Sequence, residues 1–226
     1  MRNIVKDKCS CLMLTYINYE RFENALRCFL RQTYPDKELI IVTNGADSYT
    51  EVVTNIVAEN NAEKLVKIYD IRNNYGTLAD MRNLALWFCN GEFVCIWDDD
   101  DEYGDKRIER QVECLKKNMD KFYTIFGNCT YSSEGFPQRE ITGANLKGSM
   151  LFRNKAKDEC LFMGEYDEYQ KFAKKDGIVL KNDPKDYIFV KHKLNVRDNS
   201  YFTDLIRNNE SIIDKFKKKA ERNEKD

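Results

Sequence analysis

Apolar residues recur along the first half of the chain in two alternating patterns, one typical of buried strands and the other of amphipathic helices. Short runs rich in β-branched residues predict strands, and the segments between them carry apolar residues at helical spacing. The predicted strands are Cys9–Thr15, Glu38–Thr43, Val66–Ile71 and Glu92–Trp97, and the predicted helices are Glu20–Gln32, Ser48–Asn60, Leu78–Cys89 and Lys106–Asn118. Four strand–helix units in series indicate an α/β fold with a mostly parallel sheet and right-handed crossovers.

The carboxyl ends of the predicted strands carry polar residues that such a sheet gathers at one edge. These residues are Thr15 and Tyr16, Thr43 and Asn44, Asp70 and Arg72, and Asp98 to Asp101. Ligands of open α/β sheets bind in the crevice at the carboxyl ends of the strands. We therefore expect the functional site at this edge.

The pattern changes after residue 120, where strands and helices no longer alternate regularly. The later predicted elements are the strands Phe122–Phe126 and Ile178–Leu180 and the short helix Asp167–Lys175, and the segment from about Asn128 to Lys157 is irregular. No linker rich in proline, glycine and serine divides the chain, so residues 1–205 are predicted to form a single domain. Residues 206–226 form a charged segment that predicts a solvated C-terminal helix or tail.

Composition narrows the class of protein. Of the 226 residues, 42% are hydrophobic, which is enough for a packed core, and the formal net charge of −1 argues against nucleic acid as the main partner. The eight cysteines include no Cys-x-x-Cys pair and the chain has one histidine, so we expect no structural zinc site. No signal peptide is evident, and no apolar stretch approaches the roughly 18 residues of a membrane span. The sequence predicts a cytoplasmic protein without a transmembrane segment.

An acidic run ends the fourth predicted strand. Phe93–Trp97 reads as a buried strand and is followed directly by Asp98–Glu102, five consecutive acids. Adjacent carboxylates repel one another, and a divalent cation with its preference for oxygen ligands relieves that repulsion. The run therefore indicates an enzyme that handles phosphates or sugars, with a solvated acidic loop as the alternative. A calcium-binding EF-hand is excluded because Arg110 stands where the loop needs a bidentate glutamate.

Two long segments of the chain resemble glycosyltransferase family 2, whose members have the GT-A fold. The segments are LTYINYERFENALRCFLRQTYPDKELIIVTNG and NNYGTLADMRNLALWFCNGEFVCIWDDDDEYGDKRI, and the resemblance spans roughly residues 8–200. It implies a GT-A, Rossmann-like α/β/α sandwich with a mixed, mainly parallel sheet. It also implies a nucleotide-binding half of about residues 8–118 and an acceptor-facing half of about residues 119–205.

The resemblance implies a nucleotide-sugar donor, which in this family is often a UDP-sugar. It also implies a divalent cation, Mn²⁺ or Mg²⁺. By position, Asp98 and Asp100 correspond to the two aspartates of the family's D-x-D motif. Asp98 is then expected to face the ribose or the water shell of the metal, and Asp100 to ligate the metal, with Asp99 and Asp101 beside them. His192 corresponds to a late histidine that approaches the metal or the diphosphate, or else it is a hydrogen-bonded strand residue.

Donor recognition is expected at the first two strand ends and at the third helix. The resemblance places Thr15 and Tyr16 near the nucleobase, although Tyr16 also fits simple core packing. Asn44 stands where the family has an aspartate that contacts the base, and an amide can also pair with a uracil edge or serve as a turn residue. Arg82, followed by Asn83, matches the family's "RN" pair near the diphosphate; alternatively, Arg82 pairs with Asp80 or with the acidic run.

The catalytic base is expected in the stretch MGEYDE. Glu165 corresponds to the carboxylate that deprotonates the acceptor hydroxyl, and Asp167 is the next candidate. Acids are also favoured in a first helical turn, which is the structural alternative. The resemblance implies single-displacement transfer, with inversion, to a glycan, protein or lipid acceptor, and peripheral membrane contact is compatible with a lipid acceptor. A nucleotidyltransferase is disfavoured because residues 12–20 contain no glycine, while a sugar-nucleotide-binding protein without activity stays open.

Overall fold

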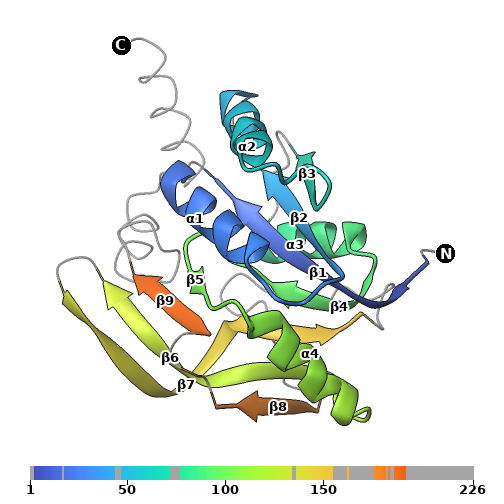
Figure 1. The fold of residues 1–226 in the computed structure, drawn as a ribbon, viewed down its shortest axis with the longest axis vertical. Helices are drawn as coiled ribbons and strands as arrows, with labels where there is room; N and C mark the ends of the chain where they lie inside the picture. Colours follow the sequence, from blue (N-terminus) through green and yellow to red (C-terminus); the bar gives the residue numbers. More distant parts are fainter. Residues whose placement is uncertain are drawn as a thin grey trace. The chain divides into compact units, whose positions relative to one another are not determined.

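The structure is a computed structural model, and most of what it describes belongs to one compact unit. The described residues are 3–16, 18–43, 47–71, 77–133, 136–154, 162, 176–181, 183 and 186–191. The chain divides into one unit of Met1–Ser132 with Pro137–Val190 and a second of Ser133–Phe136 with Lys191–Asp226. The first unit contains the sheet core and all the described helices, so the account below concerns that unit (Figure 1).

The first half folds into the four strand–helix units that the sequence predicts. The strands are β1 (Val5–Thr15), β2 (Lys37–Thr43), β3 (Val66–Asp70) and β4 (Gly91–Ile96), and the helices are α1 (Tyr19–Leu30), α2 (Asp47–Glu59), α3 (Leu78–Phe88) and α4 (Arg107–Lys117). The four strands are parallel and stand in the order β3-β2-β1-β4. The chain therefore reverses its direction across the sheet after β3, and β4 joins the other side of β1 (Figure 1).

The register of the sheet brings the carboxyl ends of these strands together, as predicted. Thr15 of β1 pairs with Thr43 of β2, and Thr43 pairs with Asp70 of β3. On the other side, Leu12 pairs with Ile96, so β4 ends close to the end of β1. The acidic run therefore begins at the same edge as Thr15.

The core forms two layers because successive side chains of each strand point to opposite faces of the sheet. Cys11, Ile41 and Cys95 lie in one buried cluster with residues of α1, α2 and α4. The neighbouring Leu12, Ile40, Val42, Val94 and Ile96 lie in a second cluster with residues of α3. Helices thus cover both faces of the parallel strands, which confirms the predicted α/β/α sandwich.

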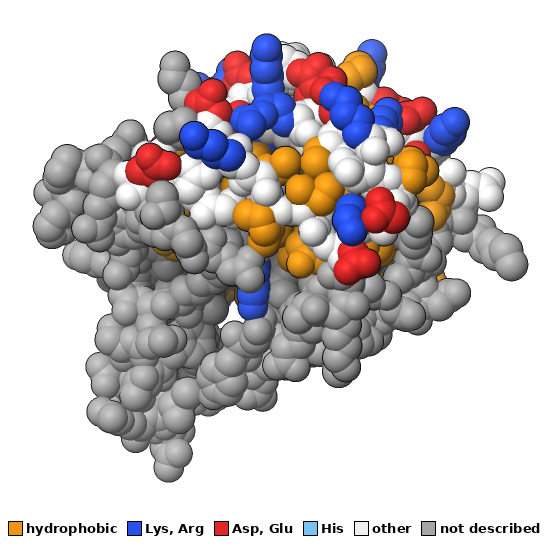
Figure 2. Space-filling view, turned by 90° about the horizontal axis from the view of Figure 1, so that it is seen from below, with side chains coloured by type: hydrophobic (Ala, Val, Ile, Leu, Met, Phe, Trp, Pro, Cys, Tyr) orange, Lys and Arg blue, Asp and Glu red, His pale blue; other side chains and the backbone are white. Residues whose placement is uncertain are grey.

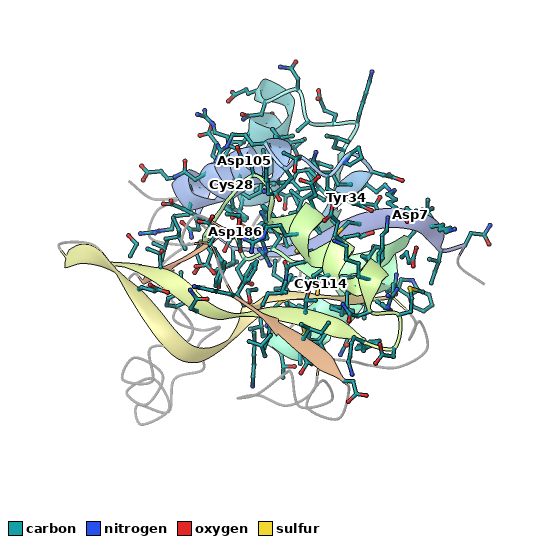
Figure 3. All side chains as sticks on the ribbon, turned by 60° about the horizontal axis from the view of Figure 1, so that its bottom comes forward. Asp7, Cys28, Tyr34, Asp105, Cys114 and Asp186 are labelled. Carbon is teal, nitrogen blue, oxygen red and sulfur yellow. The ribbon has the colours of Figure 1, made fainter. Side chains whose placement is uncertain are left out.

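The amino end of β1 lies at the edge of the sheet opposite to the acidic run, and two contacts hold it there. The Tyr34 hydroxyl donates to the Asp7 carbonyl, and Lys116 Nζ lies 2.5 Å from Asp7 Oδ1. Asp7 and Tyr34 are labelled in Figure 3. Lys116 belongs to the last turn of α4, so this helix runs back toward the amino ends of the strands. Residues near its end, such as Asn118, are remote from the carboxyl edge of the sheet.

The second half extends the sheet with strands that the sequence reveals only in part. The added strands are β5 (Glu102–Tyr103), β6 (Tyr123–Ser133), β7 (Phe136–Arg153), β8 (Gly177–Leu180) and β9 (Tyr187–Lys191). β7 pairs antiparallel with β4, and β6 lies next to β7 in the sheet. The predicted strands at 122–126 and 178–180 are confirmed, whereas the predicted helix at 167–175 lies outside the described residues.

The expectation of an irregular segment between Asn128 and Lys157 was wrong, because β6 and β7 occupy most of it. The stretch from Thr130 to Lys147 is largely polar, so it lacks the alternation that signals a half-buried strand. Its pairing depends on backbone hydrogen bonds to a neighbouring strand, which local sequence does not encode.

Two observations concern the surface of the described part. In the coloured part of Figure 2, lysines and arginines stand among aspartates and glutamates, so neither charge dominates the described residues seen there. Within the described residues, none of the helices has the length and apolar character needed to cross a lipid bilayer.

Candidate active site

Trp97, the residue between β4 and the acidic run, is held by two hydrogen bonds. The Trp97 backbone N–H donates to the Leu12 carbonyl at 2.9 Å, and its indole Nε1 donates to the Ala25 carbonyl at 3.0 Å. Trp97 is fully buried and its ring packs against Phe29 and Tyr103. The buried indole therefore fixes the point at which the chain leaves the core, and the carboxylates follow at the edge of the sheet.

Asp98 accepts one hydrogen bond on its carboxylate and one on its backbone carbonyl, and it lies against a glycine. Its Oδ1 accepts from Arg82 Nη2 at 3.1 Å, and its carbonyl accepts from the Tyr103 hydroxyl at 3.0 Å. A Cβ on Gly148 of β7 would lie only 2.7 Å from Asp98 Oδ2, so the missing side chain leaves room for the carboxylate. Arg82 is only 6% exposed, so its side chain lies beneath the surface of the site. In the structure Arg82 pairs with the acidic run, which was the alternative prediction for this residue.

Asp99 connects the acidic run to β1 and α2. Thr15 Oγ1 donates to Asp99 Oδ2 at 2.6 Å, and the same hydroxyl contacts the Tyr49 hydroxyl. Asp99 as a whole residue is partly exposed. Burial of its carboxyl group and the charges of Asp100 and Asp98 raise its pKa to about 8, although the hydrogen bond from Thr15 lowers it. Burial is the larger of these causes, and the neighbouring negative charges add to it; both disfavour the ionised form of Asp99.

Asp101 has a different environment from the other acids. It is 3% exposed, and its carboxylate accepts from the Tyr187 hydroxyl at 2.6 Å and from the Val190 backbone N–H at 3.0 Å. Burial, with the charges of Asp100 and Asp98, raises its pKa well above the usual value. Asp101 thus ties the acidic run to β9, a contact that holds the loop and that the sequence did not suggest.

A buried arginine lies behind the run. Arg107, at the start of α4, is fully buried, and its Nη2 donates to the Ile96 carbonyl at 2.8 Å and to the Gly148 carbonyl at 3.2 Å. Its guanidinium lies 4.4 Å from the centre of the Tyr103 ring and 5.1 Å from that of Trp97. This positive charge bridges β4 and β7 beneath the carboxylates and offsets part of their repulsion. Sequence analysis missed it because an arginine at a helix start normally faces solvent.

Tyr16 forms an exposed aromatic surface at the end of β1. Tyr16 is 38% exposed and the nearby Tyr19 is 40% exposed. Both rings pack around the buried Tyr49. This exposure argues against the core-packing alternative for Tyr16. Tyr16 lies at the edge of the sheet where Asp99 and Thr15 also lie.

The family model described as Glycosyl transferase family 2 matches residues 10–173 of the chain, which extend from within β1 through β7 and leave out β8 and β9. The chain belongs to glycosyltransferase family 2. The match begins at β1 and covers the acidic run.

Curated relatives from this family cover the chain only in part. The chain is 27% identical over 162 residues to the GalNAc(5)-diNAcBac-PP-undecaprenol beta-1,3-glucosyltransferase of Campylobacter jejuni, an alignment of 70% of this chain and 50% of that protein. It is 29% identical over 115 residues to the O-antigen biosynthesis glycosyltransferase WbnJ of Escherichia coli, which aligns 50% of this chain and 44% of that protein. The chain therefore spans about half the length of the curated relatives it matches.

Solved structures show the same fold at low sequence identity. S. aureus TarS 1-349 in complex with UDP-GlcNAc matches with a TM-score of 0.61 and 21% identity, over 82% of this chain and 59% of that one. The mannosyltransferase PcManGT from Pyrobaculum calidifontis, in complex with GDP-Man and Mn²⁺, matches with a TM-score of 0.62 and 15% identity, over 90% of this chain and 65% of that one. These likenesses confirm the GT-A fold class.

The carboxylates of this family 2 chain fit a divalent cation that is shared with a substrate. Among the described residues, no three Asp, Glu, His or Cys side chains converge as a complete metal cage. Mg²⁺ and similar ions, however, commonly bind through one or two carboxylates together with substrate phosphates. Asp98 and Asp100 are partly exposed at the sheet edge, which is compatible with an ion held in this way.

Several predicted site residues fall outside the described part of the chain, namely Asn44, Glu165, Asp167 and His192. Their roles stay predictions. One described residue leads toward the predicted base: Phe162, three positions before Glu165, is bound through its backbone by Asn83.

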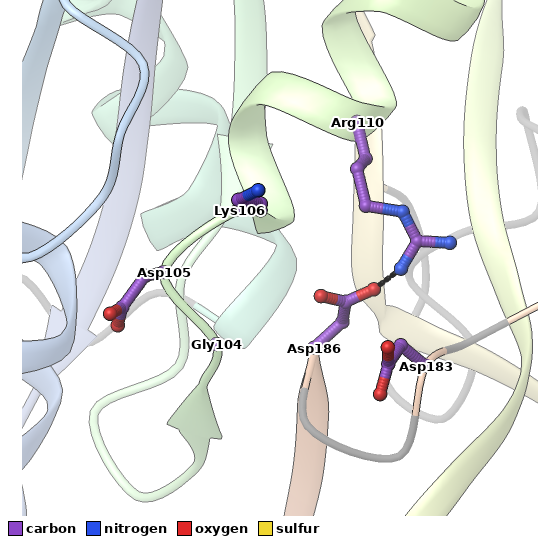
Figure 4. Close-up of a pocket in the computed structure, with 6 residues that line it drawn as sticks. All are labelled: Gly104, Asp105, Lys106, Arg110, Asp183 and Asp186. Carbon is purple, nitrogen blue, oxygen red and sulfur yellow. Dashed lines mark ion pairs between the residues drawn. The ribbon is translucent and has the colours of Figure 1, made fainter.

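A separate cavity lies beyond the acidic run. Its volume is about 380 Å³, and its lining is made by Gly104, Asp105, Lys106, Arg110, Asp183 and Asp186 (Figure 4). Arg110 and Asp186 form an ion pair across it. None of the predicted donor-site residues lines this cavity, so we assign it no part in catalysis.

Proposed function

We propose that this chain is the catalytic domain of a glycosyltransferase that uses a nucleotide-diphosphate sugar, a UDP-sugar, as donor. The observation that carries the proposal is the position of Asp98–Asp101 at the carboxyl edge of a parallel sheet, beside Thr15 and the exposed Tyr16. Family membership and the GT-A fold support it, as do relatives named as glycosyltransferases. The acceptor is a hydroxyl group on a glycan, protein or lipid.

In this proposal the nucleotide binds at the ends of β1 and β2. The Tyr16 ring packs against the base, Thr15 lies beside it, and Asn44 pairs with the edge of the base. Arg82 acts through Asp98, because it holds that carboxylate at 3.1 Å and has little exposed surface of its own. Asp99, bound to Thr15, connects the base side of the site to the diphosphate side.

Asp98 and Asp100 would hold Mn²⁺ or Mg²⁺, with His192 as a further ligand. Bound there, the cation supplies positive charge against the charge that grows on the departing nucleoside diphosphate. The chain contributes the orientation of these carboxylates: Arg82 aims Asp98, and Arg107 holds the strand end on which both stand. Asp101, bound to β9, is proposed to stabilise the loop and not to ligate the cation.

The transfer is proposed to be one in-line displacement. Glu165, or else Asp167, takes the proton of the acceptor hydroxyl. The hydroxyl oxygen forms a bond to the anomeric carbon while the bond from that carbon to the diphosphate oxygen breaks, and the electron pair leaves with the nucleoside diphosphate. Because attack and departure are on opposite faces, the anomeric configuration inverts.

A panel of nucleotide sugars tests the proposal. The purified chain is incubated with each donor and Mn²⁺ or Mg²⁺, and release of the nucleoside diphosphate is measured with and without EDTA. We expect one UDP-sugar to be turned over, with turnover lost in EDTA and in Asp100→Ala. Activity that survived both changes would refute the metal role. Donor-dependent thermal stabilisation without any turnover would instead identify a sugar-nucleotide-binding protein.

The extent of the domain and the compartment stay proposals. We propose that residues 1–205 form the GT-A domain and that the protein acts in the cytoplasm, where thiols stay reduced. All seven cysteines within the described residues are free thiols, and six of these are buried.

A further inference from the structure

A chain of hydrogen bonds joins separate elements at the carboxyl edge of the sheet. Thr15 Oγ1, at the end of β1, donates to Asp99 Oδ2 at 2.6 Å, and the same hydroxyl contacts the hydroxyl of Tyr49 on α2. The backbone N–H of Asn18, the residue before α1, donates to the Tyr49 hydroxyl at 3.4 Å. Tyr49 therefore connects α2 to the end of β1 and, through Thr15, to the acidic run.

The groups at the two ends of this chain determine the direction of each hydrogen bond in it. A backbone N–H can only donate, so the Tyr49 oxygen accepts from Asn18. A threonine hydroxyl has a single hydrogen, and Thr15 gives this hydrogen to Asp99, so the Tyr49 hydroxyl must donate to Thr15. Burial raises the pKa of Tyr49 to about 12, so its hydroxyl keeps the proton at neutral pH and remains a donor.

The ring of Tyr49 packs under the exposed aromatic residues of the same edge. Tyr49 is 1% exposed, and the centre of its ring lies 6.4 Å from that of Tyr16 and 5.1 Å from that of Tyr19. These separations are typical of aromatic pairs in contact. The ring thus supports Tyr16, whereas the hydroxyl acts on Thr15, so a variant that lacks only the hydroxyl separates the two contributions.

We propose that Tyr49 is a positioning residue for the nucleotide of the donor, and that its hydroxyl orients Thr15 and, through Thr15, Asp99. This inference rests on the proposed function, in which the nucleotide binds beside Thr15 and Tyr16. Because Tyr49 is buried, it touches neither the nucleotide nor the cation in this proposal. Sequence analysis did not single it out, since a tyrosine in a helix carries no local sign of a contact with a distant strand.

Removal of the Tyr49 hydroxyl should weaken nucleotide binding without slowing the chemical step. In Tyr49→Phe the ring stays, but the Thr15 oxygen loses its hydrogen-bond donor, and its own hydroxyl can turn away from Asp99. Loss of one such hydrogen bond corresponds to about a 3- to 10-fold change in an equilibrium constant. We expect the Kd for UDP in the presence of Mn²⁺ and the KM for the donor to rise by that factor, with kcat within about twofold of wild type.

Tyr34→Phe is the matched control. Tyr34 is 8% exposed, and its hydroxyl donates to the Asp7 carbonyl at the opposite end of β1. Each variant thus removes one tyrosine hydroxyl that contacts β1, but only Tyr49 is linked to Asp99. We expect the two variants to lose similar amounts of Tm, and we expect Tyr34→Phe to bind UDP within about twofold of wild type. Equal weakening of UDP binding in both variants would overturn the proposal.

A double-mutant cycle with Thr15→Val tests whether Tyr49 acts through Thr15. Valine has nearly the shape of threonine but lacks the hydroxyl, so it removes the middle of the chain. If the proposal is correct, Tyr49→Phe has no further effect on UDP affinity when it is added to Thr15→Val. A purely structural role for Tyr49 predicts additive effects, and additive effects overturn the proposal.

Failure of the proposed function would be seen separately from failure of this inference. If the wild-type chain binds no UDP in the presence of Mn²⁺, the proposed donor is wrong and the inference falls with it. If the wild-type chain binds UDP and Tyr49→Phe binds it equally well, the inference alone is wrong. The inference also fails if kcat falls in Tyr49→Phe while UDP affinity stays unchanged.

Discussion

Replacing Gly148 by alanine tests whether the position of Asp98 is as restricted as the structure indicates. The added methyl group would lie 2.7 Å from Asp98 Oδ2 and 2.9 Å from the Tyr187 hydroxyl. The first distance is about 0.7 Å shorter than an ordinary contact of 3.4 Å. Neither neighbour moves freely, because Asp98 is held by Arg82 and Tyr187 by Asp101. The carboxylate must therefore shift by several tenths of an ångström or lose its ion pair.

The magnitude follows from that shift. Overpacking of this kind costs about 1–3 kcal/mol of stability, and misplacing a catalytic group by about 1 Å costs on the order of 10²-fold in rate. For Gly148→Ala we expect kcat/KM to fall about 10- to 100-fold, which corresponds to roughly 1.4–2.7 kcal/mol of transition-state stabilisation. The affinity for Mn²⁺, measured by the metal dependence of UDP binding, should fall in parallel.

Gly127→Ala is the matched control. A methyl group there would also lie 2.7 Å from a neighbour, but this neighbour is Val179 Cγ1, on a residue of strand β8 that is 65% exposed. The exposed valine can turn away, and it belongs to β8, which pairs with β6. We expect Gly127→Ala to change Tm by an amount similar to or smaller than that of Gly148→Ala, with kcat/KM close to wild type. Equal kinetics in both variants would refute the argument that Gly148 makes room for Asp98.

Three further predictions address other parts of the molecule. Arg82→Met should raise KM for the donor at least tenfold with a smaller change in kcat, since a buried partner of Asp98 is lost; steady-state kinetics would contradict this if only kcat fell. Tyr16→Ala should weaken UDP binding by about 1–3 kcal/mol if the ring stacks on the base, as titration calorimetry can measure, and unchanged affinity would place the base elsewhere. Burial works to raise the pKa of Glu38, but hydrogen bonds from two lysines and a serine outweigh burial and lower it. Because the pKa of Glu38 is lower in the folded state, the ionised carboxylate stabilises the fold at pH values above its unfolded-state pKa of about 4.3. This contribution is lost as pH falls through the folded-state pKa. Glu38→Gln should therefore make the unfolding free energy depend less on pH in the acid range. An identical acid limb in wild type and variant would show that Glu38 does not contribute.

The outcome of the sequence predictions follows from how local each signal is. The predicted helix at 106–118 matches α4 to within one residue at either end, because helical spacing is written in a dozen consecutive residues. The strand at 136–153 was missed, because its pairing with β4 joins residues far apart in the sequence, such as Leu151 beside Cys95. Tyr187 and Val190, which bind Asp101, were missed for the same reason.

The linear sequence was enough to identify the family and the fold class. The different periodicities of strands and helices predicted the parallel sheet, and the apolar strand that ends in Asp98–Asp101 predicts a cation-binding edge. The folded structure was needed to distinguish Asp98, Asp99 and Asp101 from one another. Asp98 is paired with Arg82, Asp99 with Thr15 and Asp101 with Tyr187, each through a contact that joins elements distant in sequence. Consecutive carboxylates are chemically equivalent in the sequence, and they become different only when folding surrounds each one with different donors and a different degree of burial.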